Sequence, residues 1–408
     1  MFVFPVTCFC FRTLYSFARE PYRLTPMQLQ SNPQPPDEHP MPPPTKPDAK
    51  LDATLFRRKL AGWYKTHARE LPWRNVNDPY RTWLSEIMLQ QTRVAAVIDH
   101  YQNFLRRFPT MFSLALATEA EVLATWSGLG YYRRARHLHK TAQFLVRERN
   151  GQLPKTATDL RTLPGIGEYT SAAIASIAFG ESIAVVDGNV ERVLLRVTGR
   201  PETKSAAGRA FVQKIASALI PRRSRAEGAN SPGDHNQAMM ELGATICLPR
   251  APLCLNCPIF SMCKTRGEHI TNARAAQLSR QSAYLLSLRK RGTQTEVLLE
   301  QRADDASLMP GMYELPPIPL DAVQGREPLL RLRHAITNTN YYVQIFAAHG
   351  PEDKGLRRAV PASSKDLTWV LINRLSTLPL TGLTRKALQR LEVMQVNLPR
   401  LPATATTQ

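Results

Sequence analysis

The sequence predicts a mainly α-helical part followed by a smaller α+β domain. From Leu51 to about Arg274, apolar residues recur at three-to-four spacing, which is typical of amphipathic helices. Farther along the chain the pattern changes to short runs rich in β-branched and aromatic residues, which favour strands. Near the end of the first part, a run of 17 residues, 247–263, begins and ends with cysteine and contains four of them.

Helical periodicity is found in seven stretches of the first part. They are residues 55–68, 83–108, 119–127, 134–148, 169–179, 190–199 and 236–246. Proline or glycine interrupts the pattern at Pro72, at Pro109 and in the segments 128–130, 163–167 and 187–188. In the second part, strands are expected at 283–288, 296–300, 341–346 and 367–372, and a final helix at 383–394.

Changes in composition set the expected domain boundaries. Residues 1–50 contain the proline-rich run 33–48, so we expect an unpacked, disordered extension, or an upstream artefact with Met27 as the true start. Residues 51–275 are expected to form the first folded domain and residues 276–398 the second. The last residues, 399–408, are expected to be a tail.

The net charge of the chain limits the kinds of partner that it is expected to bind. Lysine and arginine number 53 against 33 acidic residues, a net charge of +20, and such a field attracts polyanions. Nucleic acid, an anionic membrane surface and simple solubility are all compatible with it, and nucleic acid is favoured. No run of 18 or more apolar residues occurs, so no membrane span is expected. The apolar N-terminus lacks the basic segment of a secretion signal and only weakly resembles an organellar presequence.

Four cysteines with the spacing C-x6-C-x2-C-x5-C indicate a metal centre. They are Cys247, Cys254, Cys257 and Cys263. The chain has only six cysteines, and the other two, Cys8 and Cys10, are adjacent to the N-terminus, which argues for a reducing compartment rather than disulfides. A zinc ribbon usually has two C-x2-C pairs, whereas this run has one pair and two longer arms. The spacing alone therefore leaves zinc and a 4Fe-4S cluster open, and disfavours four structural thiols.

The segment LPGIGEYT, residues 163–170, predicts a tight turn followed by a helix. Glycine amides and the first amides of a helix bind phosphate without preference for a base, which suits a clamp on a DNA backbone. An ordinary turn between two helices explains the same pattern equally well. The segment therefore indicates a phosphate site only in combination with other evidence.

Two carboxylates are candidates for acid chemistry. Glu86 lies on a predicted helix among apolar residues, where desolvation can raise its pKa enough to donate a proton near neutral pH. For a single glutamate, however, a solvated helical position is the more common situation. Asp187 precedes another helix, where an aspartate is most often an N-cap. Together with a phosphate site, the two carboxylates are compatible with glycosidic cleavage through an oxocarbenium ion.

Seven motifs occur in one order along the chain and together resemble the adenine DNA glycosylases of the MutY type. They are LPWR (71–74), WLSEIMLQQT (83–92), GLGYYRRAR (128–136), LPGIGEYT (163–170), VVDGNVERV (185–193), NQAMMELG (236–243) and the cysteine run. Each motif is moderately specific, and the ordered set is highly specific. The resemblance covers roughly residues 52–265 and continues more weakly to about residue 395, where that family carries a Nudix-like domain.

The resemblance implies a helix-hairpin-helix glycosylase core followed by a smaller α+β Nudix-like domain. A six-helix module of about 78–178 would face a cluster module made of about 51–77 and 179–275, in which the four cysteines hold one 4Fe-4S cluster. The implied partner is double-stranded DNA with adenine opposite 8-oxoguanine or guanine, bound by a monomer with no membrane contact. The implied location is cytoplasmic, at a bacterial nucleoid, or the nucleus or mitochondrion of a eukaryote.

The resemblance also implies a role for each residue that matches a motif. Glu86 would protonate nitrogen 7 of an extruded adenine, Asp187 would stabilise the sugar cation, and Tyr169 and Asn189 would orient these groups and the water. The residues at the base and at the DNA are Arg69, Leu71, Trp73 and Gln237 around adenine, Gln91 and Tyr131 at the base stack, Gly165 and Gly167 at phosphate, and Gln90 as a further substrate- or DNA-binding residue. Without the motifs, Tyr131 and Trp73 would be taken as core aromatics and Gln91 as a surface amide.

Two other functions remain open. Endonuclease III-type glycosylase/lyases resemble this chain in the hairpin, the aspartate and the cysteine spacing, but they need a lysine on the hairpin, where this chain has Tyr169. The presence of Glu86 and the long segment after the cysteines also favour the adenine glycosylase. A noncatalytic lesion-binding protein is the other alternative, and intact Glu86 and Asp187 argue against it.

The C-terminal domain departs from the family pattern. The loop that reads oxidised guanine commonly has Phe-Ser-His, where this chain has Ile336, Thr337 and Asn338. Thr337 and Asn338 still offer hydrogen-bonding groups, so we expect recognition of 8-oxoguanine to persist in a weaker form. The acidic Nudix signature is missing around residues 311–317, and no nucleotide hydrolysis by this domain is expected.

Overall fold

The computed structural model describes residues 51–76, 78–202, 205–222, 231–269, 277–336, 338–348, 354–360 and 366–395. The predictions for residues 1–50, for the tail 399–408 and for Thr337 lie outside the described residues. Within the described part, no helix combines the length and the apolar character needed to cross a membrane.

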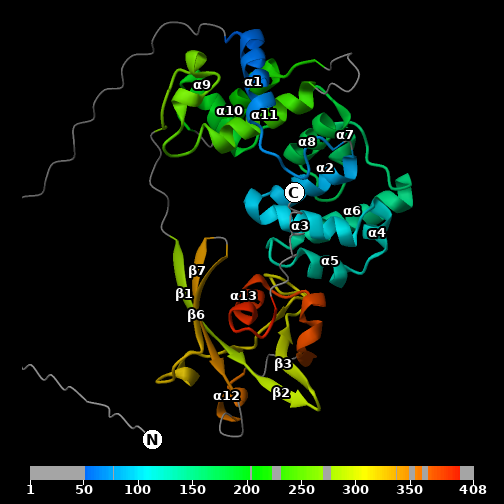
Figure 1. The fold of residues 1–408 in the computed structure, drawn as a ribbon, viewed down its shortest axis with the longest axis vertical. Coiled ribbons are helices and arrows are strands. Elements are labelled where there is room, and N and C mark those ends of the chain that lie inside the picture. Colours follow the sequence, from blue (N-terminus) through cyan, green and yellow to red (C-terminus); the bar gives the residue numbers. More distant parts are fainter. Residues whose placement is uncertain are drawn as a thin grey trace, which may run out of the picture. The chain divides into compact units, whose positions relative to one another are not determined.

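Helices form the first part of the chain (Figure 1). They are α1 (Ala53–His67), α2 (Pro79–Leu89), α3 (Val94–Arg107), α4 (Met111–Leu116), α5 (Glu119–Trp126), α6 (Arg133–Arg149), α7 (Ala157–Leu160), α8 (Glu168–Phe179), α9 (Gly188–Thr198), α10 (Ala206–Leu219) and α11 (Ser231–Thr245). Aspartate caps begin α1 and α2, because the side chains of Asp52 and Asp78 accept from the first free backbone amides.

The stretch 83–108 is two helices rather than one continuous run. Helix α2 ends at Leu89, and α3 begins at Val94. The chain turns between them at Gln91, whose φ of +55° is incompatible with a continuing right-handed helix. The apolar periodicity on both sides of this turn concealed it, because each helix contributes its own apolar face to the same core.

Two hydrophobic cores organise the helices. One core gathers residues of α2 to α8, including the fully buried Trp83, Phe104 and Trp126. The other gathers residues of α1, α9, α10 and α11, including Phe56 and Leu194. Figure 1 shows the same two groups of helices. Helix α10 belongs to the second core although it was not among the predicted helical stretches.

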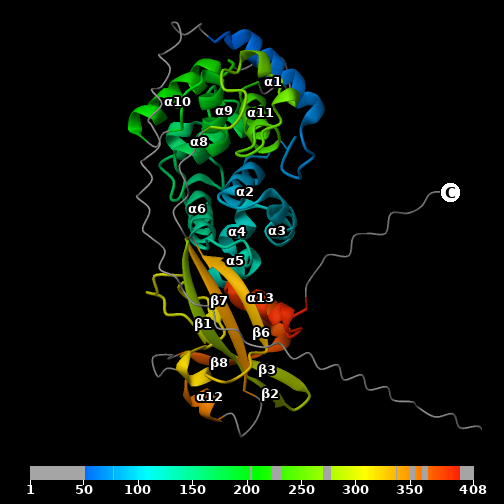
Figure 2. The same ribbon diagram turned by 90° about the vertical axis from the view of Figure 1, so that its left-hand side faces the viewer.

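Two sheets form the second part, in which strands β1, β6 and β7 lie side by side (Figure 2). One sheet has the order β5-β1-β7-β6, and in the other β3 pairs with β2, β4 and β8. The strands are β1 (Leu278–Leu286), β2 (Leu288–Arg291), β3 (Gln294–Gln301), β4 (Tyr313–Glu314), β5 (Pro317–Ile318), β6 (Leu330–Ile336), β7 (Thr339–Ala347) and β8 (Leu367–Leu371). Strand β1 runs parallel to β7, with Leu278 opposite Thr339, and β6 runs antiparallel to β7.

Two short helices complete this part, α12 (Lys354–Arg358) and α13 (Gly382–Arg390). Leucines of α13 pack on the same core as Val343 and Ile345 of β7. The predicted fold class, a mainly helical part followed by a smaller α+β domain, is confirmed. Strand β6 was not predicted, although Leu330 to Arg333 alternate between apolar and charged residues as a half-buried strand does.

Candidate active site

One cleft brings together almost all the predicted site residues, and its volume is about 1590 Å³. The predicted residues that line it are Arg69, Leu71, Trp73, Glu86, Gln90, Gln91, Tyr131, Gly165, Gly167, Tyr169, Asp187, Asn189 and Gln237. They come from α2, α8, α9 and α11, from the loops on both sides of α2, and from the segments that precede α6, α8 and α9. Residues far apart in sequence therefore converge on one site.

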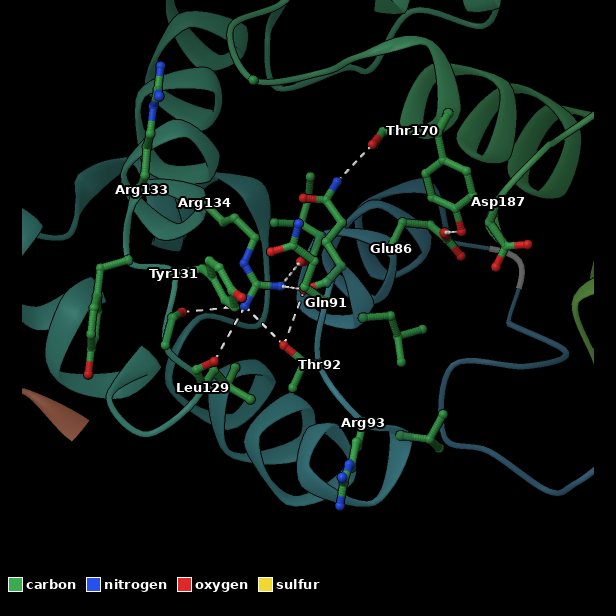
Figure 3. Close-up of a pocket in the computed structure, with 18 of the residues that line it drawn as sticks. Glu86, Gln91, Thr92, Arg93, Leu129, Tyr131, Arg133, Arg134, Thr170 and Asp187 are labelled. Atoms are coloured by element: carbon green, nitrogen blue, oxygen red, sulfur yellow. Dashed lines mark hydrogen bonds between the residues drawn. The ribbon is translucent and has the colours of Figure 1, made fainter. Parts of the chain in front are cut away.

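Glu86 lies at the bottom of this cleft and is only 6% exposed. It is on α2, which packs against both α3 and α8, so that even its carboxylate is withdrawn from water. The Tyr169 hydroxyl donates to Glu86 Oε2 at 2.8 Å (Figure 3). Burial, with a contribution from the nearby Asp187 charge, raises the pKa of Glu86 to about 7, although the Tyr169 hydrogen bond opposes the shift. The alternative of a solvated glutamate is therefore wrong.

Asp187 caps α9 and faces the same cleft. Its Oδ1 accepts from the Val190 amide at 2.7 Å, and its Oδ2 accepts from Asn189 Nδ2 at 2.8 Å. The N-cap interpretation is thus correct for Oδ1, and it fixes the carboxylate in a position from which it also lines the cleft. Close packing supports this arrangement, because a Cβ on Gly243 of α11 would lie only 2.5 Å from the Asn189 Cβ.

A second buried carboxylate, Glu241 of α11, was not among the predicted site residues. Glu241 is 1% exposed and lines the cleft, where it accepts two bonds from the Arg69 guanidinium at 2.7 and 2.8 Å and one from Arg74 at 2.6 Å. Burial opposes its ionisation, but the hydrogen bonds and charges of the two arginines outweigh burial and lower the pKa of Glu241 to about 2. The only signal in the sequence was a glutamate within the motif NQAMMELG.

Two residues that were expected at the base stack protrude into the cleft with unusual backbone geometry. Gln91 has a φ of +55° and Tyr131 a φ of +49°, values that non-glycine residues rarely adopt. Tyr131 is 46% exposed, so it is not a core aromatic. Trp73 differs, because it lines the cleft while it packs edge-on against Tyr101 in the core, with ring centroids 5.3 Å apart. Beside Gln91, Gln90 donates to the Thr170 hydroxyl at 2.9 Å.

The predicted phosphate site lies at the start of α8. Gly165 has a φ of +74°, and a Cβ there would lie 2.5 Å from the His137 Cβ, so both the turn and the packing require glycine. Gly167 precedes the first residue of α8, and no side chain caps this helix. Both glycines are exposed, which leaves their backbone accessible from the cleft.

The four cysteines line a second, small pocket together with Arg196 of α9. Arg196 is 2% exposed and donates to Cys247 Sγ at 3.4 Å, while the Arg266 amide donates to Cys263 Sγ at 3.5 Å. In the described part of the chain, no group of three or more His, Cys, Asp or Glu residues could hold a single metal ion. Four cysteine side chains that line one pocket are a donor set that suits a metal centre.

A hydrogen-bonded chain connects the cysteine pocket with Asp187. Arg192 of α9 donates to the Cys247 carbonyl at 2.8 Å and to Asn189 Oδ1 at 2.8 Å. Asn189 in turn donates to Asp187. The segment that carries Cys247 therefore contributes to the position of a cleft carboxylate.

Residues of the second domain also line the cleft. Ile336 lines it together with His334 and Ala335 of β6. Asn338 is exposed in the turn between β6 and β7 and does not line the cleft. Of the two residues expected to offer hydrogen-bonding groups to the opposite base, Asn338 therefore does not reach the cleft, and Thr337 lies outside the described residues.

Comparisons with known proteins show which chains this protein is similar to. Residues 84–216 match the family model of the HhH-GPD superfamily of base excision DNA repair proteins. The adenine DNA glycosylase of Rattus norvegicus is 46% identical over 224 residues, which cover 52% of this chain and 42% of the rat protein. That of Homo sapiens is 44% identical over 226 residues, covering 53% and 40%. A solved thermostable thymine-DNA glycosylase gives a TM-score of 0.47 at 27% identity, covering 52% of this chain and 96% of that chain.

The predicted resemblance to MutY-type adenine DNA glycosylases is thus confirmed for the helical part of the chain. The chain spans about two fifths of the length of the rat and human relatives that it matches.

Proposed function

We propose that this protein, whose helical part belongs to the HhH-GPD superfamily of base excision DNA repair proteins, removes adenine from duplex DNA. The substrate is adenine opposite 8-oxoguanine or guanine. One observation carries the proposal: Glu86, a buried carboxyl group with a pKa of about 7, lies in the same cleft as the N-cap residue Asp187. An acid beside an anion is the arrangement required to break a glycosidic bond through a cationic sugar.

Glu86 supplies the proton. At neutral pH a substantial fraction of Glu86 is protonated, and its proton moves to nitrogen 7 of an adenine extruded into the cleft. The bond between sugar C1′ and adenine N9 then breaks, and its electron pair leaves with the base. The sugar remains as an oxocarbenium ion. Tyr169 holds Glu86 Oε2, so that the other carboxyl oxygen is available to carry the proton.

Asp187 stabilises the sugar cation through its negative charge. Val190 and Asn189 each hold one of its oxygens, so that the charge is fixed before the cation forms and no reorganisation is needed during the reaction. Water then adds to C1′ and releases its proton to Glu86, which restores the starting acid. Atoms and charges balance with one water consumed and one adenine released.

The chemistry ends with base release because a nucleophilic amine is missing from the hairpin. A lyase forms a Schiff base between a lysine and the sugar, and the corresponding position is Tyr169, whose hydroxyl is engaged by Glu86. This supports a monofunctional glycosylase over the endonuclease III type.

The surrounding residues bind the duplex and the extruded base. The exposed amides at Gly165 and Gly167 bind backbone phosphate, and the protruding Gln91 and Tyr131 occupy the space that the base leaves in the stack. Arg69, fixed by Glu241, borders the adenine pocket. The segment from Ile336 to Asn338, of which Ile336 lines the cleft, recognises the opposite base with an altered set of residues, which weakens discrimination for 8-oxoguanine.

The four cysteines hold one 4Fe-4S cluster. When bound, the cluster joins η1 (Cys254–Asn256) and η2 (Phe260–Met262) to the end of α11 and stabilises this segment. Its role is structural and DNA-positioning, since the bond-breaking carboxylates belong to other elements.

A glycosylase assay tests the proposal. Duplexes with adenine opposite 8-oxoguanine, guanine or cytosine are incubated with the protein, and strands are cleaved with alkali afterwards. We expect cleavage only after alkali, fastest opposite 8-oxoguanine. Equal single-turnover rates opposite 8-oxoguanine and guanine would remove the proposed discrimination, and strand breaks before alkali would favour the lyase.

A further inference from the structure

We propose that Arg134 is a positioning residue. It holds the segment around Gln91 and the segment around Tyr131 in a fixed position relative to each other, so that both enter the base stack of the duplex together. This inference rests on the proposed function. Arg134 is on the first turn of α6 and lies in the cleft between the two segments (Figure 3). Its Nη1 group binds the end of α2, and its Nη2 group binds both the turn after α2 and the loop that carries Tyr131.

The Nη1 group binds the end of α2. It donates to the Ile87 carbonyl at 2.8 Å, to the Met88 carbonyl at 3.1 Å and to the Gln90 carbonyl. The last carbonyls of a helix lack partners within the helix, and α2 ends at Gln90 with a non-helical backbone instead of a glycine cap. Arg134 therefore serves as the cap of the helix that carries the acid Glu86.

The Nη2 group faces the loop that carries Tyr131. It donates to the Gly130 carbonyl at 3.3 Å, to the Leu129 carbonyl at 3.5 Å and to the Thr92 hydroxyl at 3.0 Å. The guanidinium also lies 5.3 Å from the centre of the Tyr131 ring, a cation–π contact. Through one planar group, the loop before α6 is thus fixed to the turn after α2.

Both segments need such a restraint. Gln91 and Tyr131 are non-glycine residues in the left-handed region, which are held there only when surrounding contacts determine the backbone. The carbonyls that Arg134 binds, of Gln90 and Gly130, belong to the residues immediately before these two. Burial lowers the pKa of Arg134 to about 10, a penalty that a side chain with only a general basic role would avoid by facing solvent.

A lysine cannot replace this arrangement. Arginine has two terminal nitrogens in a rigid fork, whereas lysine presents one ammonium group that reaches one segment at a time. The charge would be retained in Arg134→Lys, but the connection between the segments would be lost. The lysine variant therefore separates bridging from charge.

The experiment measures extrusion and bond cleavage separately on the full chain. Extrusion is followed by 2-aminopurine fluorescence next to a non-cleavable 2′-fluoroadenosine opposite 8-oxoguanine, and cleavage by single-turnover rates on the matching adenosine duplex. For R134K and R134M we expect about a 100-fold lower rate, because small displacements near the reacting groups have effects of this size. We expect the aminopurine signal at saturation to be largely lost in both variants.

A double-mutant cycle shows whether Arg134 acts through the two segments. In a background of Gln91→Ala and Tyr131→Ala, R134K should lower the rate by less than about 5-fold, because the segments it positions are already disabled. The matched control is Arg133→Met, which removes the exposed neighbouring charge that also lines the cleft. It should weaken duplex binding while the saturated aminopurine signal remains.

Three results would overturn the inference: wild-type behaviour of R134K, full additivity in the cycle, or an unchanged aminopurine signal in a slow variant. If R134M does not fold, R134K carries the test alone. Absence of adenine release by the wild-type protein would instead contradict the proposed function, and the aminopurine signal would still report on Arg134.

Discussion

Two buried glutamates of the helical domain have opposite electrostatic states. Glu86 on α2 is 6% exposed and Glu241 on α11 is 1% exposed, so both are withdrawn from water to a similar degree. The pKa of Glu86 is raised to about 7, whereas the pKa of Glu241 is lowered to about 2. Burial alone therefore does not decide the charge of a carboxyl group in this protein.

The partners of each carboxylate account for the difference. At Glu86 burial favours the protonated form, the nearby charge of Asp187 adds to this effect, and the single neutral donor Tyr169 does not offset it. Glu241 has two arginines, which provide three charge-assisted hydrogen bonds from their side chains and outweigh the burial of the anion. The environment of Glu86 keeps a proton on a carboxyl group that lines the cleft. The carboxylate of Glu241 fixes the positions of two arginine side chains beside it.

The largest expected effect comes from Glu86→Gln, which preserves the shape of the side chain and removes the proton donor. We expect the single-turnover rate to fall by about 10² to 10⁴-fold, the usual contribution of general acid catalysis. Binding of a duplex with a non-cleavable adenine should remain within a few fold. A variant that keeps more than a tenth of the wild-type rate would contradict the role of Glu86 as the acid.

The same variant should be more stable than the wild-type protein in alkaline solution. Because the pKa of Glu86 is higher in the folded protein, the wild type loses stability as pH rises from about 4.5 to about 7, at roughly 1.4 kcal/mol per unit. The loss amounts to about 3 kcal/mol above pH 7 and is absent below pH 4.5. Urea unfolding of both proteins at pH 5 and pH 8 measures it, and equal differences at the two pH values would contradict the buried-acid assignment.

Asp187→Asn should have the next largest effect. The amide keeps the size of the side chain but removes the charge that stabilises the sugar cation, so we expect a rate loss of about 10² to 10³-fold. Because the Asp187 charge contributes to raising the pKa of Glu86, the alkaline limb of the rate profile should also move to lower pH. Unchanged product formation would show that the catalytic assignment of Asp187 is wrong.

Glu241→Gln tests the other member of the comparison. Removal of the anion leaves Arg69 and Arg74 without their counter-charge, so the free energy of unfolding should fall. Because Arg69 is partly exposed, we expect a loss of about 2 to 3 kcal/mol. Above pH 4.5 this stabilisation is complete in the wild type, and it is lost as pH falls towards about 2. We expect a rate loss of about 10-fold from displacement of Arg69 at the cleft.

The matched control for Glu241→Gln is Glu148→Gln on α6, which removes a carboxylate from the exposed pair with Arg147. Exposed pairs contribute little, so no measurable change in rate or stability is expected. If Glu241→Gln behaved like this control, the two arginines would be positioned by something other than the buried carboxylate.

The comparison also shows how far the sequence could predict the site. Glu86 and Asp187 follow from local motifs, because each is embedded in a conspicuous segment of helix or turn. Glu241 was missed, since its partners Arg69 and Arg74 are about 170 residues away and only tertiary packing brings them together. The break at Gln91 was missed because apolar periodicity continued across it. Strand β6 was missed although Leu330 to Arg333 alternate between apolar and charged residues.

The smallest expected effect, and the most direct test of the comparison, is Tyr169→Phe. The hydroxyl of Tyr169 favours the charged form of Glu86, so its removal should raise the pKa of Glu86 further and move the alkaline limb of the rate profile to higher pH. The rate at low pH should fall only a few fold, because the acid is retained but less well oriented. Tyr80→Phe removes another buried hydroxyl bond, to the Phe108 carbonyl at 2.8 Å, and should leave the pH profile unshifted. If the alkaline limb of the rate profile stayed in place in Tyr169→Phe, or moved in Tyr80→Phe, the hydrogen-bond partners of Glu86 would not determine its pKa.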